Sequence, residues 1–345
     1  MIHPGGSGEA SLLEVRNLVK HYPVHRSISD TLRRLPHQAV RAVDGVSFSI
    51  AKGKTLALVG ESGCGKTTTG RCVLFLQQPT SGDVIVRGER IDPSDEAAMR
   101  LRRKQLQIIF QDPSSSLNPR MTVGQTLGEV LVFHKMVESG ERNQAVTGLL
   151  ETVGLSGQQA GRYPNELSGG QRQRVGIARA LAVNPELIVA DEPVSALDVS
   201  VQAQILQLLD RLRDERDLSY LFISHDLGVV RHIADEVAVM YLGVIVERAP
   251  TATLYEHPLH PYTRALLAAA PVANPRLRRE RAPIFGDPPS PLAPPSGCRF
   301  RTRCPFATER CANDVPALRE LEPRHWVACH YAEEFRSGGG PFRPL

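Results

Sequence analysis

The sequence predicts an α/β protein built on a parallel sheet, and three observations support this fold class. Three short apolar runs, Thr55–Val59, Leu187–Ala190 and Tyr220–Ile223, have the length and composition of buried parallel strands. Polar residues follow the two later runs, and the first leads through a Gly-rich loop into an expected helix. Strands that alternate with crossover helices are typical of a parallel sheet covered by helices.

Other segments complete the predicted architecture. Leu12–Leu18 and Val46–Ile50 alternate apolar and polar residues, as half-buried strands do. Residues 96–173 are rich in helix formers, so we expect a helical insert that Asp-Pro and Asn-Pro pairs interrupt. Ten prolines lie between Pro258 and Pro295, which predicts an extended connection with little regular structure.

These changes in composition divide the chain into four parts. We expect a flexible N-terminus over residues 1–11 and a catalytic domain over 12–255, with its helical subdomain at about 96–173. A Pro-rich, Cys-containing C-terminal extension would follow over 256–336, and a flexible Gly-rich tail over 337–345.

Composition and charge exclude several classes of protein. Hydrophobic residues make up 41% of the chain and charged residues 23%, which argues against a fibrous or disordered protein. The longest apolar run, Val237–Val246, is shorter than the roughly 20 residues of a membrane-spanning helix. A net charge of +4 is too small to predict a nucleic-acid ligand. The N-terminus has no signal-peptide pattern, which predicts a cytosolic chain.

The Gly-rich loop after Thr55–Val59 matches the phosphate-binding pattern G-x-x-x-x-G-K-[ST]. In such a loop the backbone N–H groups and a helix N-terminus hold phosphate oxygens. The Lys66 ammonium is expected to reach the β- and γ-phosphates, and the Thr67 hydroxyl to ligate Mg²⁺. The fold class is therefore that of a P-loop NTPase. The predicted nucleotide contacts of the loop are Gly60, Glu61, Ser62, Gly63, Cys64, Gly65, Lys66, Thr67 and Thr68.

Candidate residues for hydrolysis follow the two other apolar runs. Asp191, at the end of one run, is expected to reach Mg²⁺ through water, and Glu192 is the candidate general base for the attacking water. His225 follows the other run and is expected to contact the γ-phosphate or to hold that water. These residues predict magnesium-dependent hydrolysis of a nucleoside triphosphate.

A second Gly-rich turn opens an expected helix over Gln171–Leu181, and so predicts a second anion-binding site. One nucleotide cannot readily use two separate phosphate cradles in one chain. We therefore expect a head-to-tail dimer, in which each nucleotide meets the phosphate loop of one subunit and this turn of the other. The residues predicted to make the second contact are Ser168, Gly169, Gly170 and Gln171.

The order of these motifs resembles that of ATP-binding cassette (ABC) transporter ATPases, over about residues 12–250. The resemblance implies ATP as the nucleotide and a RecA-like core with an antiparallel β subdomain and a helical insert. It also implies that Tyr22 stacks on adenine and that Gln111 links Mg²⁺ to transmembrane partners. Asp198 would lie in the dimer-contact loop.

Longer phrases resemble the dipeptide/oligopeptide permease branch, most closely its second dipeptide-permease ATPase subunit. The phrases are SSSLNPR at 114–120, DEPVSALDVS at 191–200, HPLHPYTRALL at 257–267 and PSPLAPPSGC at 289–298. This resemblance implies peptide import at the cytoplasmic face of the cell membrane, where the chain would be peripheral. The implied partners are a second, distinct ATPase subunit, two transmembrane permease subunits and an extracytoplasmic peptide-binding protein. Importers of nickel, glutathione and muropeptides share the layout and stay open as alternatives.

Four cysteines, Cys298, Cys304, Cys311 and Cys329, lie in the predicted extension. Their spacing is neither that of a zinc finger nor that of a bacterial ferredoxin, so the chemistry alone leaves a [4Fe–4S] cluster and zinc open. The resemblance to peptide-permease ATPases implies the [4Fe–4S] cluster, with unliganded thiols as a third alternative. A cluster of this kind can staple a segment that is too poor in apolar core to fold alone.

Two other classes of function are alternatives to the transporter. A soluble ABC ATPase acting on DNA or ribosomes usually carries two cassettes or long coiled-coil inserts, whereas this chain has one cassette and no heptads. A redox sensor would place the function in the cysteine-containing extension rather than in the ATPase. Chelation of the metal separates this hypothesis from the transporter, because the transporter should keep its nucleotide binding.

Overall fold

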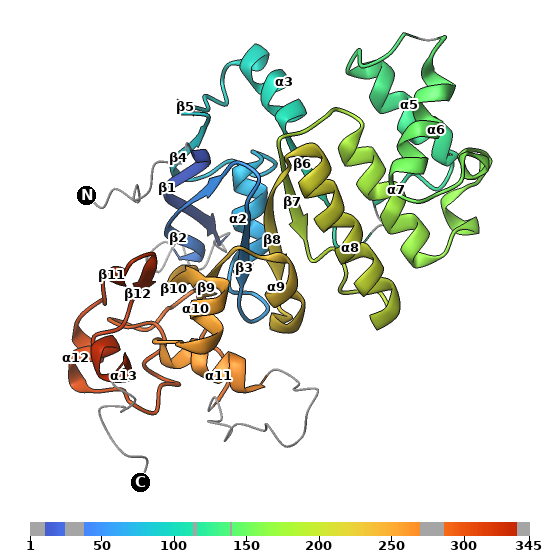
Figure 1. Ribbon diagram of the computed structural model, residues 1–345. Coiled ribbons are helices and arrows are strands. Elements are labelled where there is room, and N and C mark those ends of the chain that lie inside the picture. Colours follow the sequence, from blue (N-terminus) through green and yellow to red (C-terminus); the bar gives the residue numbers. More distant parts are fainter. Residues whose placement is uncertain (1–10, 25–37, 113–115, 139, 270–285, 337–345) are drawn as a thin grey trace. The chain divides into compact units, whose positions relative to one another are not determined.

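The computed structural model describes residues 11–24, 38–112, 116–138, 140–269 and 286–336 (Figure 1). The tail predicted to be flexible, 337–345, lies outside these ranges, as does the N-terminus except for Ser11. The chain folds into two compact units. The first comprises residues 1–49, 56–90 and 224–345, and the second comprises residues 50–55 and 91–223. No helix in the described ranges is both long and apolar enough to cross a membrane.

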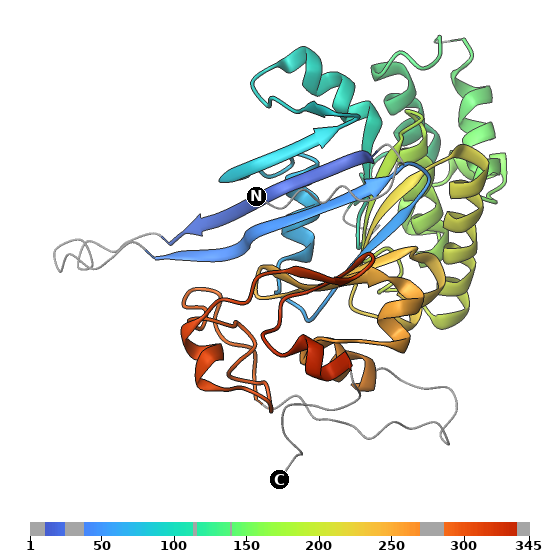
Figure 2. The same ribbon diagram turned by 60° about the vertical axis from the view of Figure 1, so that its left-hand side comes forward.

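The first unit contains an antiparallel sheet in the order β2-β1-β4-β5. Figure 2 shows β1 and β2 (blue) and β4 (cyan) side by side. The buried Leu13 and Val15 of β1 face Val86 and Val84 of β4, and this pairing explains the alternation seen in the sequence. The strands are β1 (Ser11–Pro23), β2 (Ala39–Ala51), β4 (Ser81–Val86) and β5 (Glu89–Arg90).

The phosphate loop follows β3 (Thr55–Val59), all of whose residues are buried. β3 pairs in parallel with β9 (Glu236–Tyr241), and β10 (Val244–Pro250) returns antiparallel to β9. The apolar run Val237–Val246 is therefore divided between two strands, with a turn at Leu242-Gly243. Helix α2 (Lys66–Val73) begins directly after the loop, and α9 (Leu227–Ile233) precedes β9.

The C-terminal extension adds strands to β10 in the same unit. β12 (His325–Val327) pairs with β10, and β11 (Arg319–Glu322) pairs with β12, both antiparallel (Figure 1). Residues 286–308 contain no helix or strand, and 286–295 of these belong to the predicted Pro-rich connection, whose residues 270–285 lie outside the described ranges. The prediction was wrong for α11 (Pro261–Ala269), because proline is tolerated in the first turn of a helix. The remaining helices are α10 (Thr251–Glu256), α12 (Glu309–Asn313) and α13 (Ala332–Arg336).

A buried carboxylate joins the extension to the sheet. Glu247 of β10 is fully buried and accepts the backbone N–H groups of Leu259 (2.7 Å) and His260 (3.0 Å). His325 Nε2 lies 2.8 Å from the same carboxylate. A small apolar core lies beside these contacts and contains Leu259, Val327, Ala332 and Phe335.

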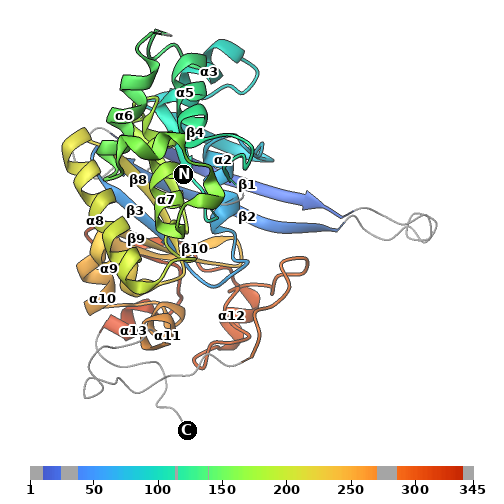
Figure 3. The same ribbon diagram turned by 90° about the vertical axis from the view of Figure 1, so that its right-hand side faces the viewer.

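The second unit contains three parallel strands in the order β8-β7-β6, with helices grouped as Figure 3 shows for α5, α6 and α7. The strands are β6 (Leu106–Ile109), β7 (Leu187–Asp191) and β8 (Ser219–Ser224). β6 was not predicted from the sequence and lies within the segment 96–173 expected to be mostly helical: Leu106 and Ile109 are buried where β6 pairs with β7. The helices are α3 (Glu96–Gln105), α5 (Val123–Phe133), α6 (Arg142–Thr152), α7 (Gly169–Leu181) and α8 (Val199–Arg216), with 3₁₀ turns at Gly157–Gly161 and Pro164–Glu166.

Candidate functional site

The phosphate loop depends on two glycines that lie against backbone carbonyls. A Cβ atom at Gly60 would lie 2.2 Å from the Met240 carbonyl oxygen, and one at Gly65 would lie 2.1 Å from that of Ala42. Both glycines also have positive φ angles, 150° and 109°. The loop therefore requires glycine at both positions for steric and conformational reasons.

Lys66 lies inside the loop and is 5% exposed. Its ammonium donates hydrogen bonds to the carbonyl oxygens of Gly60 (2.8 Å) and Glu61 (3.0 Å). The positive charge is thus held within the loop that precedes the N-terminus of α2, where phosphate oxygens bind in proteins with this motif.

Two of the six cysteines lie in and after the loop, and both are buried. Burial raises the pKa of the Cys64 thiol above its ordinary value and raises that of Cys72 to about 11. Neither thiol has the lowered pKa of a reactive nucleophile.

The structure brings the predicted residues Gln111 and Glu192 together in the second unit. The Gln111 side chain donates a hydrogen bond to the Glu192 carboxylate (2.9 Å), and the Glu192 backbone N–H donates to the Ile223 carbonyl (3.0 Å). Asp191 ends β7 and is 3% exposed. Glu192 has a φ of 47°, a left-handed conformation that costs about 1–3 kcal/mol for a residue other than glycine. Such strain is common at functional sites.

The Ser168–Gln171 turn is a capping box at the start of α7. The Ser168 hydroxyl accepts the Gln171 backbone N–H (3.3 Å), and the Gln171 side chain accepts the Ser168 backbone N–H (2.9 Å). Gly170 lies against α8, because a Cβ atom there would be 2.6 Å from Val201 Cγ1. Asp198 caps α8 by accepting the Val201 N–H (3.0 Å). Val199, the next residue, is 81% exposed.

The other predicted site residues lie in the first unit. The Tyr22 hydroxyl donates a hydrogen bond to Gln77, and the Lys20 ammonium lies 4.9 Å from the centroid of the Tyr22 ring. His225 is exposed at the end of β8. The phosphate loop also belongs to this unit, whereas Gln111, Asp191 and Glu192 belong to the second. The individual roles of all these residues stay predictions.

One contact of the loop was not predicted from the sequence. The Glu61 carboxylate pairs with both terminal nitrogens of Arg303, a residue of the extension that is 242 positions away along the chain. The Tyr262 hydroxyl of α11 accepts the Glu61 backbone N–H (2.9 Å). No sequence motif marks either partner, because the pairing depends on how the extension folds back.

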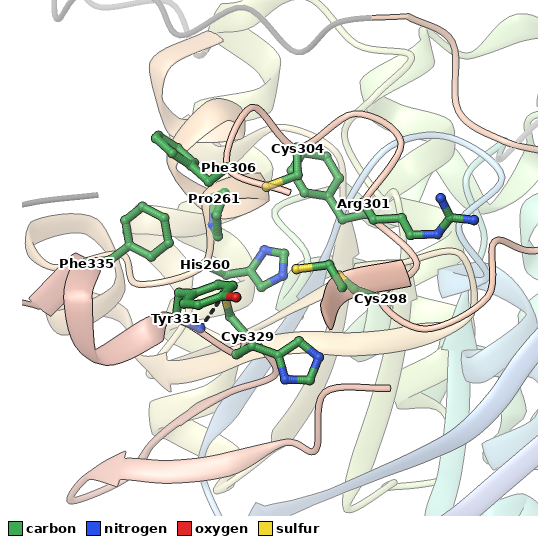
Figure 4. Close-up of a pocket in the computed structure, with 12 residues that line it drawn as sticks. His260, Pro261, Cys298, Arg301, Cys304, Phe306, Cys329, Tyr331 and Phe335 are labelled. Carbon is green, nitrogen blue, oxygen red and sulfur yellow. Dashed lines mark hydrogen bonds between the residues drawn. The ribbon is translucent and has the colours of Figure 1, made fainter. Parts of the chain in front are cut away.

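The four cysteines of the extension line one small cavity of about 20 Å³. Figure 4 shows Cys298, Cys304 and Cys329 around it, with the rings of His260 and Tyr331. Burial and, to a smaller extent, the neighbouring thiols Cys298, Cys329 and Cys311 raise the pKa of Cys304 to about 12. The structure thus places four thiols together, with Cys311 buried and the other three half-buried, although they are as many as 31 positions apart in the sequence.

The side chains, as they are placed, do not surround a single metal ion. Within the described ranges, no group of three or more His, Cys, Asp or Glu side chains is placed so that it could hold one ion. His325, four residues before Cys329, is hydrogen-bonded to the Glu247 carboxylate. His330, the residue after Cys329, lines the cavity and is hydrogen-bonded to the Asp314 carbonyl (3.0 Å). The donor atoms suit an iron–sulfur group or zinc, and the metal site itself stays a prediction.

Comparison with family models identifies two matching regions. A model described as "ABC transporter" matches residues 43–195, and one described as "Oligopeptide/dipeptide transporter, C-terminal region" matches residues 246–311. The first region contains the phosphate loop, Gln111, the Ser168–Gln171 turn and Glu192. The second contains three of the four clustered cysteines, all but Cys329.

Curated proteins and solved structures agree with these matches. The oligopeptide transport ATP-binding protein AppF of Bacillus subtilis is 51% identical over 94% of this chain and 98% of its own length. The di/tripeptide transport ATP-binding protein DppF of Pseudomonas aeruginosa is 47% identical over 94% and 99%. A dimeric ATP-binding cassette in a post-hydrolysis state, bound to ADP and Pi, superposes with a TM-score of 0.60. That structure is 28% identical and covers 69% of this chain and 98% of its own.

Proposed function

This chain belongs to the ATP-binding subunits of the dipeptide/oligopeptide permease family of ABC transporters, and on this premise we propose that it powers uptake of short peptides. As a member of this family it is an ATPase. The observation that carries the proposal is the phosphate loop, in which Lys66 is held by the Gly60 and Glu61 carbonyls directly before α2. The names of the relatives support peptides as the substrate class.

The proposed mechanism assigns a role to each predicted residue. The phosphate loop and Lys66 bind the β- and γ-phosphates, while Tyr22 stacks on the adenine. Thr67 and the buried Asp191 would supply the oxygen ligands that Mg²⁺ prefers, and Gln111 would link that Mg²⁺ to the transmembrane partners. Mg²⁺, when bound, neutralises the charge that develops on the transferred phosphoryl group. Glu192 takes the proton of the attacking water, and His225 positions that water against the γ-phosphate.

We further propose that ATP closes a head-to-tail dimer. The Ser168–Gln171 turn would meet the nucleotide held by the partner's phosphate loop, and Asp198 would lie at the contact between subunits. The similarity to a dimeric cassette supports the same assembly.

The complete transporter would contain further proteins. We propose a second, distinct ATPase subunit as the dimer mate, two transmembrane permease subunits and an extracytoplasmic peptide-binding protein. The chain itself would be peripheral, at the cytoplasmic face of the cell membrane. Opening and closing of the ATPase dimer would pass to the permeases partly through the helical segment near Gln111.

Reconstitution of the whole complex in liposomes tests the substrate. We expect di- or oligopeptides, supplied with the binding protein, to stimulate ATP hydrolysis several-fold and to accumulate inside the vesicles. Nickel, glutathione and a muropeptide, each presented in the same way, should not stimulate. Lys66→Ala is the matched control that removes stimulation, because it removes the phosphate-binding charge. Stimulation by one of the other three ligands alone would reassign the substrate.

For the extension we propose a [4Fe–4S] cluster bound by Cys298, Cys304, Cys311 and Cys329. The four thiols that line one cavity offer the four ligands that such a cluster takes, and zinc stays the alternative. The cavity of about 20 Å³ has room for about one water molecule, so its walls would have to move apart to hold a cluster. The small apolar core of the extension supports a structural role, because a cluster that cross-links four positions of the chain would add to the limited stability that this core provides.

Anaerobic purification tests the cluster. We expect a brown protein with about four irons and four sulfides per chain. Single Cys→Ser changes at any of the four positions should remove most of the iron and make residues 290–335 sensitive to protease. Cys64→Ser and Cys72→Ser are the controls that keep the iron, since both thiols are buried in and after the phosphate loop. Zinc without iron would contradict the cluster but keep a metal site that stabilises the extension. Four freely alkylated thiols in the folded protein would exclude both the cluster and the zinc site.

A further inference from the structure

Glu61, the second residue of the phosphate loop, is held at three of its groups. Its backbone N–H donates to the Tyr262 hydroxyl (2.9 Å), and its carbonyl accepts from Lys66 (3.0 Å). Its carboxylate accepts two hydrogen bonds from Arg303, with Nη1–Oε2 at 2.6 Å and Nη2–Oε1 at 3.0 Å. Two of these three partners, Tyr262 and Arg303, come from the C-terminal extension.

The Arg303 guanidinium is in turn fixed by its surroundings. The residue is 7% exposed, and its guanidinium carbon lies 5.8 Å from the centroid of the Tyr241 ring. A planar fork with two parallel hydrogen bonds fixes both the direction and the charge of its carboxylate partner. Arg303 directly precedes Cys304 in the sequence.

Aromatic packing connects this ion pair to the cysteine cavity. The rings of Tyr241, Tyr262 and Phe300 contact one another, with centroid separations of 4.7 Å to 5.3 Å. Phe300 also packs at 5.8 Å from the ring of His260, and both of these residues line the cavity. A displacement of the segment around the cysteines would therefore also shift the residues that contact Glu61.

A second arginine of the same segment makes an indirect connection to the phosphate loop. Arg299 donates hydrogen bonds to the Asp44 carboxylate and to the Leu242 carbonyl. The adjacent Gly243 donates its backbone N–H to the Cys64 carbonyl of the phosphate loop (2.8 Å). Residues 298–304 thus reach the loop at Glu61 directly and at Cys64 through the β9–β10 turn.

We infer that the cysteine-bearing segment 298–304 positions the phosphate loop, with Arg303 as a positioning residue that orients and neutralises Glu61 for nucleotide binding. The inference rests on the proposed function in one respect, namely that this loop binds ATP. A carboxylate without a counter-charge in that loop would repel the phosphates of the nucleotide. Arg303 removes this repulsion and fixes the first turn of the loop.

Nucleotide binding by the full complex, in a Glu192→Gln background that prevents turnover, tests the inference. With a fluorescent ATP analogue, we expect Arg303→Gln to weaken binding about tenfold. Adding Glu61→Gln should recover at least threefold of this loss, because it removes the uncompensated charge. Arg303→Lys should fall between Arg303→Gln and the wild type, since it keeps the charge but loses the fork. Higher salt should reduce the penalty, as expected for a charge effect.

The matched control is Arg16→Gln, which breaks another two-bond arginine–carboxylate pair of the same unit, with Glu14 (2.6 Å and 2.8 Å). The Arg16 side chain is exposed, so the loss of this pair should leave nucleotide affinity unchanged. Wild-type affinity in Arg303→Gln would overturn the inference, and so would a loss that Glu61→Gln does not relieve. Failure of the unmodified complex to bind the analogue, or of Lys66→Ala to weaken binding, would instead contradict the proposed function.

Discussion

Glu192→Gln is expected to lower steady-state ATP hydrolysis by about 100-fold or more while ATP still binds. Removal of a general base typically costs a factor of this size, and the amide keeps the shape of the side chain and a hydrogen-bonding oxygen for Gln111. Because binding persists and hydrolysis stops, the variant should accumulate as a closed dimer with bound ATP. The measurements are ATPase activity, nucleotide stoichiometry and the mass of the ATPase pair.

Glu186→Gln is the matched control for this prediction. It makes the same chemical change just before β7, at the end opposite to Glu192, where Glu186 accepts a hydrogen bond from Gln105 (3.1 Å). Its activity should stay within a factor of about two, since surface changes away from the site have small effects. Wild-type turnover in Glu192→Gln would show that another group is the base.

Gly170→Asp is expected to abolish hydrolysis at the partner's nucleotide site, with a loss of roughly 100-fold. In the head-to-tail dimer the new carboxylate would face the γ-phosphate of the nucleotide held by the other subunit, and like charges in contact cost several kcal/mol. Photolabelling with an azido-ATP analogue separates the two sites, because the label reports which subunit's phosphate loop traps nucleotide.

The control for Gly170→Asp must account for packing inside the subunit. A Cβ atom at this position already lies 2.6 Å from Val201, so Gly170→Ala tests the steric cost of that Cβ without the charge. We expect Gly170→Ala to keep most of the labelling at the partner's site. Equal damage by both variants would attribute the effect to α7–α8 packing, and loss confined to this chain's own loop would refute the head-to-tail arrangement.

The parts of the site that could be predicted from the sequence are those that local geometry determines. The strand–loop–helix from Thr55 to Val73 and the turn before α7 follow from glycine positions and capping residues a few positions apart. The antiparallel edge strands follow from alternation, which the paired register of β1 and β4 explains. Such features depend on neighbours in the chain, so the residue pattern records them.

The remaining features depend on contacts between distant segments. β6 has only four residues, and it is stabilised by pairing with β7 rather than by its own propensity. The run Val237–Val246 contains a turn that only the pairing of β9 with β10 identifies. The Arg303–Glu61 pair joins residues of ordinary polar character, so neither one is distinguishable from a solvated surface charge before the chain folds.

The pairing of β12 with β10 also bears on the solubility of the ATPase. One side of β10 pairs with β9, and without the extension its other side would present unpaired N–H and C=O groups to a second molecule. Exposed edges of this kind promote aggregation. The strand that takes over as the outermost, β11, is only four residues long and carries Arg319, Glu320 and Glu322, which are features that discourage edge-to-edge association. The extension therefore protects the ATPase domain against edge-to-edge association at β10, and a chain shortened to residues 12–255 would lose that protection.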